Sequence, residues 1–426
     1  MYKMTWARGA LVLGLSFSAH AWAATDADLD EIRAQIRELK SSYEARIRAL
    51  EQRLKDAEEK AARPAAPVAS VPPVEASFAP VLAAPSSGGG SGLSAFNPAV
   101  SVVLQGTYAN LSQDPSKFAL AGFRTGGDAG PGRRGFSLGE SELALFANVD
   151  DKFAGTVIVS LSPEDTVSVE EAYGIYTAAP LGLAPKFGRF FSGIGYLNEQ
   201  HQHAWDFVDA PLAYQAFLGG QYAQDGVQVK WVAPLDEFLE LGAEAGSGDR
   251  FPGGPRNKNG VGSGAVYAHA GGDVGESNSW RAGVSYLHTR PGDGDGPQPE
   301  VSNRVEIADF VWKWAPNGNV RENYFKLQGE YFRGTPDAGA RQTGWYAQGV
   351  YQFMPTWRVG ARFDRLDGGA GGFGPKRYTA MLDWSPSEFS RLRLQFAQAR
   401  LVPDLTDNQW LVQYILSLGA HGAHKY

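Results

Sequence analysis

From position 97 onward, short runs of alternating apolar and polar residues recur along the chain, separated by turns. The last run, 409–418, places on one face Trp410, Val412, Tyr414, Leu416 and Leu418. A period of two is the pattern of a strand whose two sides face different surroundings. About ten residues, when tilted, is the length that crosses the hydrocarbon of a bilayer.

The pattern predicts about sixteen strands, an even number as expected for a single-chain bacterial barrel. The predicted strands cover 99–110, 137–149, 153–161, 167–177, 185–191, 224–232, 238–246, 264–271, 279–288, 303–314, 323–333, 343–352, 357–365, 376–384, 391–399 and 409–418. A closed ring of strands leaves no unpaired backbone groups in lipid. We therefore predict an all-β fold over 97–426, a transmembrane antiparallel β-barrel.

The links between these strands alternate in length. Short links, such as 150–152 and 353–356, are followed by long ones, such as 192–223 and 247–263. This asymmetry is typical of short periplasmic turns and longer outer loops, so both ends of the barrel are expected on the periplasmic side. Aromatic residues at strand ends, among them Trp357, fit the headgroup belts of a barrel better than an ordinary core.

Composition narrows the alternatives. After the N-terminus no apolar stretch reaches the ~18 residues of a membrane-spanning helix, which excludes a helical membrane protein. The chain has no cysteine, so a disulfide scaffold is excluded, and its net charge of −7 argues against nucleic acid as a partner. No catalytic triad is apparent, so we do not expect an enzyme.

The N-terminus has the pattern of an export signal. Lys3 and Arg8 precede an apolar stretch, and Ala21-Trp22-Ala23 offers a cleavage site. We predict a signal peptide over 1–23, with a buried N-terminal helix as the alternative. Export and a lipid-facing barrel together predict the outer membrane of a Gram-negative bacterium.

A helical segment and a linker are expected between the signal and the barrel. Residues 24–63 show the 3-4 spacing of an α-helical coiled coil, with seam positions at Leu29, Ile32, Ile36, Leu39 and Tyr43. A stripe this narrow needs partner helices, and isoleucine at both seam positions favours three or more, so a homotrimer is expected. The alternative is a solvated charged helix. Residues 64–96 are a Pro/Ala/Gly/Ser linker that tethers the coiled coil, in the periplasm, to the barrel.

Charged residues follow the inward face of the predicted strands. They are Glu140, Glu142, Lys230, Lys326, Glu330, Arg358, Arg362, Asp364, Arg391 and Arg393. On the lipid face a basic residue would cost about 2–4 kcal/mol at mid-depth, so the one-sided placement predicts a watery lumen lined by these residues. We interpret it as a solute pathway with an electrostatic filter; the alternative is a plug of mutual salt bridges.

The long link 192–223 is expected to narrow that pathway. It contains Trp205 and Tyr214, aromatic residues that are unusual in a loop exposed to water, together with Asp206 and Asp209. A long loop with its own apolar residues folds inward and packs. These four residues are therefore predicted to form a constriction.

The same loop offers metal ligands. His201, His203 and Asp206 supply imidazole and carboxylate groups, which suit Zn²⁺, and His421 and His424 form a second pair in the C-terminal tail. We expect no resident cofactor, with zinc as an ion that is bound or transported.

Three stretches carry a resemblance to a known family. They are FNPAVSVVLQGTYANLS from Phe96, GRFFSGIGYLNEQHQHAWDFVDAPLAYQAFLGGQYAQDGVQ from Gly188, and LGAHGAHKY at the end. They resemble a plug-less, porin-like outer-membrane family similar to phosphate-selective porin O/P, whose members are often labelled zinc-regulated TonB-dependent outer membrane receptors. The resemblance implies transport, with zinc or a metal chelate as cargo. A phosphate filter would need lysine or arginine in the loop, and 192–223 contains neither.

Three functional hypotheses follow. The first is a porin-like channel for diffusion of small hydrophilic solutes or ions, constricted by 192–223. The second is a plug-less uptake receptor for zinc or a siderophore-type metal chelate. The third is a structural protein that links the membrane to the cell wall, in which case peptidoglycan is the expected partner of the coiled coil.

Overall fold

A computed structural model describes residues 98–162, 166–293, 303–336, 340–369 and 372–419. The predicted signal peptide, coiled coil and linker lie outside the described residues, and so do His421 and His424. The described part of the chain contains no helix that is long and apolar enough to cross a membrane.

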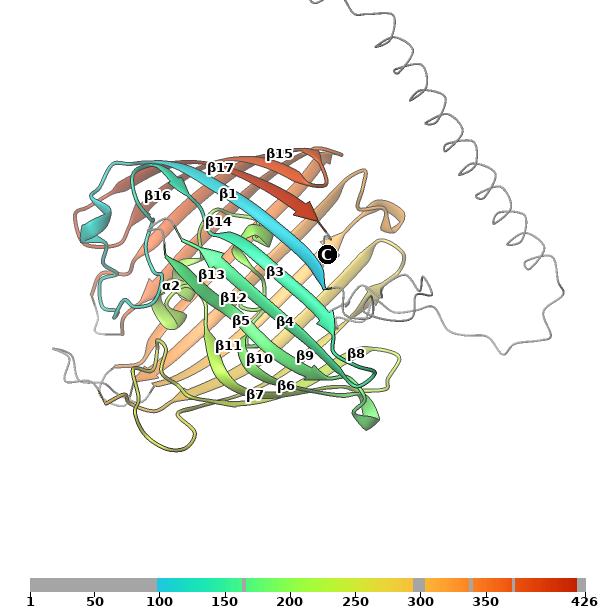
Figure 1. Cartoon of the computed structure of the whole chain (residues 1–426). Coiled ribbons are helices and arrows are strands. Elements are labelled where there is room, and N and C mark those ends of the chain that lie inside the picture. Colours follow the sequence, from blue (N-terminus) through green and yellow to red (C-terminus); the bar gives the residue numbers. More distant parts are fainter. Residues whose placement is uncertain (1–97, 163–165, 294–302, 337–339, 370–371, 420–426) are drawn as a thin grey trace, which may run out of the picture. The chain divides into compact units, whose positions relative to one another are not determined.

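One antiparallel sheet closes on itself (Figure 1). Its segments are β1 Ala99–Leu111, β2 Gly135–Leu138, β3 Ser141–Asn148, β4 Phe153–Leu161, β5 Val167–Tyr176, β6 Leu183–Phe191, β7 Ala223–Val232, β8 Phe238–Gly246, β9 Ser263–Val274, β10 Asn278–Thr289, β11 Asn303–Trp314, β12 Tyr324–Pro336, β13 Gln342–Met354, β14 Trp357–Asp367, β15 Lys376–Ser387, β16 Ser390–Arg400 and β17 Asp407–Gly419. The ring closes because β1 pairs with β17 on one side and with β2 and β3 on the other.

The barrel has sixteen strands, because β2 and β3 share one position beside β1 among the seventeen segments. The predicted sixteen-strand barrel is therefore confirmed, and the observed strand ends lie close to the predicted ones. Helices are short: α2 covers Leu212–Leu218, and single 3-10 turns are η2 Pro115–Lys117, η3 Pro180–Gly182, η4 Gln202–Ala204 and η5 Pro316–Gly318.

One predicted strand, 137–149, is broken in the structure at Gly139 and Glu140. The backbone of Gln105 bridges the break: its N–H donates to the Ser141 hydroxyl at 3.0 Å, and its carbonyl accepts from Gly139 N–H at 2.9 Å. A Cβ on residue 139 would lie 2.5 Å from Gln105 Cγ, so glycine is needed for this close approach. The break keeps β2 and β3 in one position of the ring.

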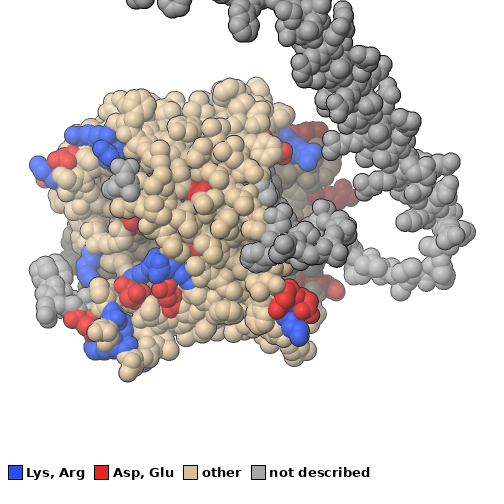
Figure 2. All heavy atoms as spheres, in the orientation of Figure 1, with Lys and Arg blue, Asp and Glu red and all other residues tan. Residues whose placement is uncertain are grey.

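The two faces of the wall differ as the alternation requires. In the outward rows, Trp345, Trp410 and Tyr414 are 39%, 50% and 47% exposed, whereas the inward Tyr346 and Gln413 are both 1% exposed. Figure 2 shows a visible wall that is mostly uncharged, interrupted by one group of acidic and basic side chains at the lower left. An apolar band between polar ends is the surface that lipid requires.

This surface predicts that a charged substitution on the lipid-facing row destabilises the barrel more in the middle of the membrane than near its edge. Val412→Arg, in the middle of β17, is expected to lower the free energy of unfolding by about 2–4 kcal/mol, whereas Leu418→Arg, near the end of the same strand, is expected to cost about 0–1 kcal/mol. Urea titrations of the protein in lipid vesicles measure both. Equal costs would contradict a lipid-facing row on β17.

Candidate functional site

Residues 192–222, between β6 and β7, fold back into the barrel rather than extending from its rim. Ile194, Leu212, Tyr214 and Phe217 are each at most 4% exposed. They form one buried apolar cluster with wall residues that include Leu287 of β10, Phe332 of β12, Tyr346 of β13 and Leu366 of β14. The loop therefore packs against the inner surface of the wall.

Helix α2 is positioned by glycines on the wall. A Cβ at Gly334 of β12 would lie 2.6 Å from the ring of Phe217, and one at Gly344 of β13 would lie 3.0 Å from the same ring. The helix ends at Gly219, whose φ of 71° is left-handed and favours glycine. These glycines let the aromatic face of α2 approach the β12–β13 backbone closely.

Wall carboxylates bind backbone N–H groups of the loop. Glu244 of β8 accepts from Gly193 N–H at 2.8 Å and from the Ser192 hydroxyl at 2.6 Å. Glu330 of β12 accepts from the N–H groups of Tyr196 and Leu197 at 3.1 and 3.2 Å and from the Tyr214 hydroxyl at 2.9 Å. Further along the loop, Leu212 N–H donates to Asp364 of β14 at 2.8 Å. These hydrogen bonds from three strands of the wall fix the course of the loop.

The two loop aspartates meet a basic part of the wall. Asp206 pairs with Lys326 of β12 and with Arg358 of β14, and Asp209 pairs with Arg362 of β14 at 3.0 Å and with Arg377 of β15. Burial would raise the pKa of Asp209, but Arg377 and Arg362 outweigh burial and lower it. Both aspartates therefore serve as anionic anchors of the loop.

Arginines of the same part of the wall also bind loop carbonyl groups. Arg393 of β16, which is 0% exposed, donates to the Trp205 carbonyl at 2.9 Å, and its neighbour in the row, Arg391, donates to the His203 carbonyl at 3.4 Å. Arg377 donates to the Ala210 carbonyl at 2.8 Å. On the other side of the loop, Lys230 of β7 pairs with Glu199 at 2.5 Å. The loop is thus held from several directions around the ring.

The structure brings nine of the ten inward charged residues named from the sequence into contact with the loop. They are Glu142, Lys230, Lys326, Glu330, Arg358, Arg362, Asp364, Arg391 and Arg393. The tenth, Glu140, has a side-chain hydrogen bond with Glu170 of β5. Most of these charges therefore anchor the loop.

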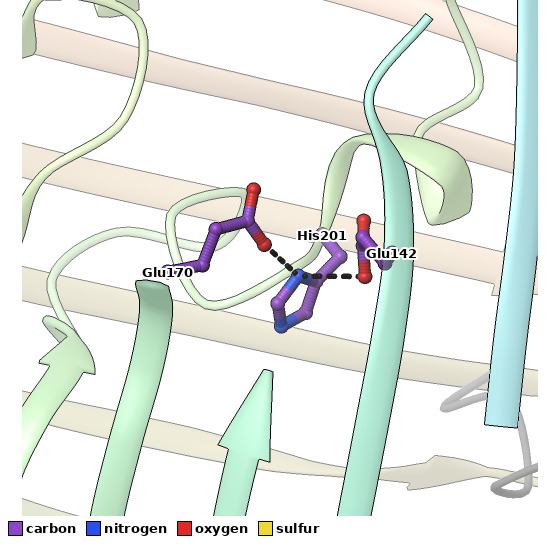
Figure 3. A group of neighbouring side chains, drawn as sticks. All are labelled: Glu142, Glu170 and His201. Carbon is purple, nitrogen blue, oxygen red and sulfur yellow. Dashed lines mark hydrogen bonds and ion pairs between the residues drawn. The ribbon is translucent and has the colours of Figure 1, made fainter. Parts of the chain in front are cut away.

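His201 of the loop meets Glu142 of β3 and Glu170 of β5 (Figure 3). The His201 Nδ1 atom lies 3.2 Å from Glu142 Oε2 and 3.1 Å from Glu170 Oε2, and its Nε2 lies 3.1 Å from Glu171 Oε2. His203 Nδ1 lies 2.9 Å from Glu142 Oε1. Burial would lower the pKa of His201, but Glu142 and the other two glutamates outweigh burial and raise it well above its usual value.

Asp206 does not join these histidines. The sequence predicts that Asp206 binds a metal with His201 and His203, but its carboxylate lies against Lys326 and Arg358. The strong attraction of a buried carboxylate to two cations explains the placement. The carboxylates beside His201 come instead from the wall.

A bulge explains why sequence reasoning missed Glu170 and Glu171. Ile158 of β4 pairs with Glu171, while the next residue, Val159, pairs with Val169, so Glu170 is an extra residue in β5. An extra residue redirects the side chains next to it, and both glutamates reach His201. The signal in the sequence is the adjacent pair itself, because a regular strand would turn one of them toward lipid.

The comparisons with known proteins agree with this architecture. No protein-family model matches the sequence. An uncharacterized protein of Aquifex aeolicus (strain VF5) is 31% identical over 386 residues, which cover 78% of this chain and 80% of that protein. This chain belongs to the same family as the Aquifex protein.

The barrel of this chain is similar to those of solved outer-membrane proteins. OmpT of Vibrio cholerae superposes with a TM-score of 0.53 for a loop L8 deletion mutant, at 12% identity over 76% of this chain and all of that one, and with 0.52 for its trimer form. The anion-selective porin of Comamonas acidovorans gives 0.51 at 10% identity, over 76% of this chain and 100% of that one. The channel DcaP of Acinetobacter baumannii gives 0.50 at 12% identity, over 78% and 99%. The fold is therefore that of outer-membrane porins and channels.

The loop anchors predict the effect of removing one aspartate. Asp209→Ala leaves Arg362 and Arg377 without their loop carboxylate; because Asp364 still contacts both, we expect a cost of about 3 kcal/mol, at the low end for a broken buried pair. The population of detached loop then rises about 100-fold. Chymotrypsin cleavage within 192–222 measures it, since the loop has aromatic residues but no lysine or arginine.

The control is Asp225→Ala, which breaks an exposed pair with Arg189 at 2.6 Å. Exposed pairs contribute about 0–1 kcal/mol, so loop cleavage should stay near the wild-type rate. A similar rise in both variants would mean that the Asp209 anchor does not hold the loop.

Proposed function

We propose that this protein is an outer-membrane channel for diffusion of small hydrophilic solutes or ions, with loop 192–223 as its constriction. The observation that carries the proposal is the loop itself, which is buried inside a sixteen-strand ring and anchored to its wall. A barrel of this size encloses more space than wall side chains fill. A loop anchored inside it sets the width of what remains.

The anchors make the constriction a fixed part of the barrel. Glu244, Glu330 and Asp364 bind the loop through its N–H groups, and Arg362, Arg377 and Arg393 bind it through aspartate and carbonyl oxygens. These wall residues come from β8, β12, β14, β15 and β16. Opening such a loop would leave several buried charges without partners, so we infer a constant narrow passage rather than a swinging gate.

Two wall cations give the passage a local positive charge. The guanidinium of Arg281 of β10 lies 5.1 Å from the ring centroid of Tyr196, and Lys313 of β11 interacts electrostatically with the hydroxyl of the same tyrosine. Within the described part of the chain, neither cation has a carboxylate within ion-pair distance. A solute that passes Tyr196 therefore meets positive charge that the loop does not neutralise.

Planar-bilayer recording tests the channel. We expect stable conductance steps, arriving in groups of three if the chain forms the proposed homotrimer. Replacing 201–219 by a short Gly/Ser linker should raise the conductance of each step several-fold, because Phe191 and Ala223 are paired neighbours that a short link can join. Shortening the outer loop at 255–261, which leaves Phe251 in place beside Gly219, is the control and should leave the conductance unchanged. Absence of steps from the purified full chain would refute the channel.

The wall cations predict a change in selectivity. Arg281→Gln with Lys313→Gln is expected to shift the reversal potential in a KCl gradient toward cations, because positive charge is removed beside the passage. Arg333→Gln, which removes a cation from an exposed pair with Glu306, is the matched control and should not shift it. An unchanged potential in the double variant would place the solute path elsewhere in the lumen.

A further inference from the structure

We propose that Glu142, Glu170 and His201 bind one divalent transition-metal ion such as Zn²⁺, held between the loop and the wall. Their ligand atoms are already placed for an ion. The His201 Nδ1 atom lies 3.2 Å from Glu142 Oε2 and 3.1 Å from Glu170 Oε2. With bonds of about 2.1 Å, a tetrahedral or octahedral ion keeps neighbouring ligand atoms roughly 3.0–3.4 Å apart.

The donor types select the class of ion. One imidazole nitrogen with carboxylate oxygens suits zinc and its first-row neighbours, whereas Ca²⁺ and Mg²⁺ prefer oxygen ligands alone. Each of the three groups comes from a different element: β3, β5 and the start of η4. An ion at this place would therefore link the loop to two strands of the wall.

The surroundings of the imidazole are those of a metal-binding histidine. Glu171 Oε2 lies 3.1 Å from the other ring nitrogen, Nε2, and the Phe191 backbone N–H donates to Glu171 Oε1 at 3.0 Å. Histidine ligands almost always place their second ring nitrogen against such a carboxylate, which fixes the ring and increases its basicity. The Phe191 ring packs edge-on against the His201 imidazole, with 5.2 Å between the two ring centroids, and this contact supports the same imidazole orientation.

One ligand carboxylate is oriented in the same way. His203 Nδ1 contacts Glu142 Oε1 at 2.9 Å, which leaves Oε2 of Glu142 directed to His201. Glu140, hydrogen-bonded to Glu170, adds a fourth glutamate to the group. The hydrogen bond between Glu140 and Glu170 holds one proton, and the three remaining negative charges with two imidazoles in one small volume favour a dication.

The competing explanation is a protonated His201 that is paired with the glutamates and binds no metal. The two explanations differ in stoichiometric metal binding and not in the placement of the side chains. The metal site goes beyond the proposed channel function and does not depend on it, since a barrel that conducts nothing could still bind the ion.

Calorimetric titration of the untagged full chain with ZnCl₂ tests the site, in a background of His421→Ala and His424→Ala that removes the tail histidines as ligands. We expect one ion per chain. Glu142→Gln with Glu170→Gln should weaken binding by roughly 100-fold or more, because two ligands are lost, and Glu171→Gln should weaken it about 10–100-fold. No binding, or unchanged binding in the double variant, would overturn the site.

The matched control is Glu330→Gln, which changes another glutamate that anchors the same loop but lies on β12. It should bind zinc as the background protein does. If it loses as much affinity as the double variant, the affinity reports loop position and the ligand assignment is wrong. Co²⁺ titration of the background protein gives a second test that does not require the double variant to fold. Ligand-field absorption of a nitrogen–oxygen site supports the proposal, and the spectrum of hydrated Co²⁺ overturns it.

Discussion

Backbone groups that lie in lipid have no water to bind, and this constraint shapes the whole described structure. The pairing of β1 with β17 and with β2 and β3 closes the ring, so that the sheet has no unpaired first or last strand. Closure also fixes which side of every strand faces inward. Because charge is costly on the lipid side, the barrel's buried charges are concentrated on the inner face, where they need partners.

The loop 192–222 supplies many of those partners, and its composition matches the wall. It has no lysine or arginine, so its aspartates can meet the arginines of β14 and β15 without competition from cations of its own. Its backbone N–H groups meet Glu244, Glu330 and Asp364. The mixed charges of the lumen, which from the sequence fitted either an open filter or a plug, are thus largely used to hold one loop. Loop and wall depend on each other, because each would otherwise bury unpaired charge.

The strands could be predicted from the sequence because lipid and lumen impose a local period of two that each strand shows by itself, as 409–418 does. The break at Gly139 and the bulge at Glu170 could not, since they depend on the register of the neighbouring strand. Asp206 shows the same limit. It lies close to His203 in sequence, yet its position is decided by Lys326 and Arg358, which are more than a hundred residues away. The loop residues could be named from the sequence, but their partners required the closed ring.

The two irregularities of the wall, the break between β2 and β3 and the bulge in β5, both lie near His201. The break between β2 and β3 contains Glu140 and lies next to Glu142, and the bulge in β5 brings Glu170 and Glu171 to His201. Pairing between β5 and β6 covers only Ala172–Ile175, so the ladder stops where His201 is bound. Bulges and breaks give up regular pairing, and they are typically found where a side chain has to be redirected for function. A barrel that needed only to span the membrane would gain more stability from regular strands here, so the irregularity is best explained by what the glutamates bind.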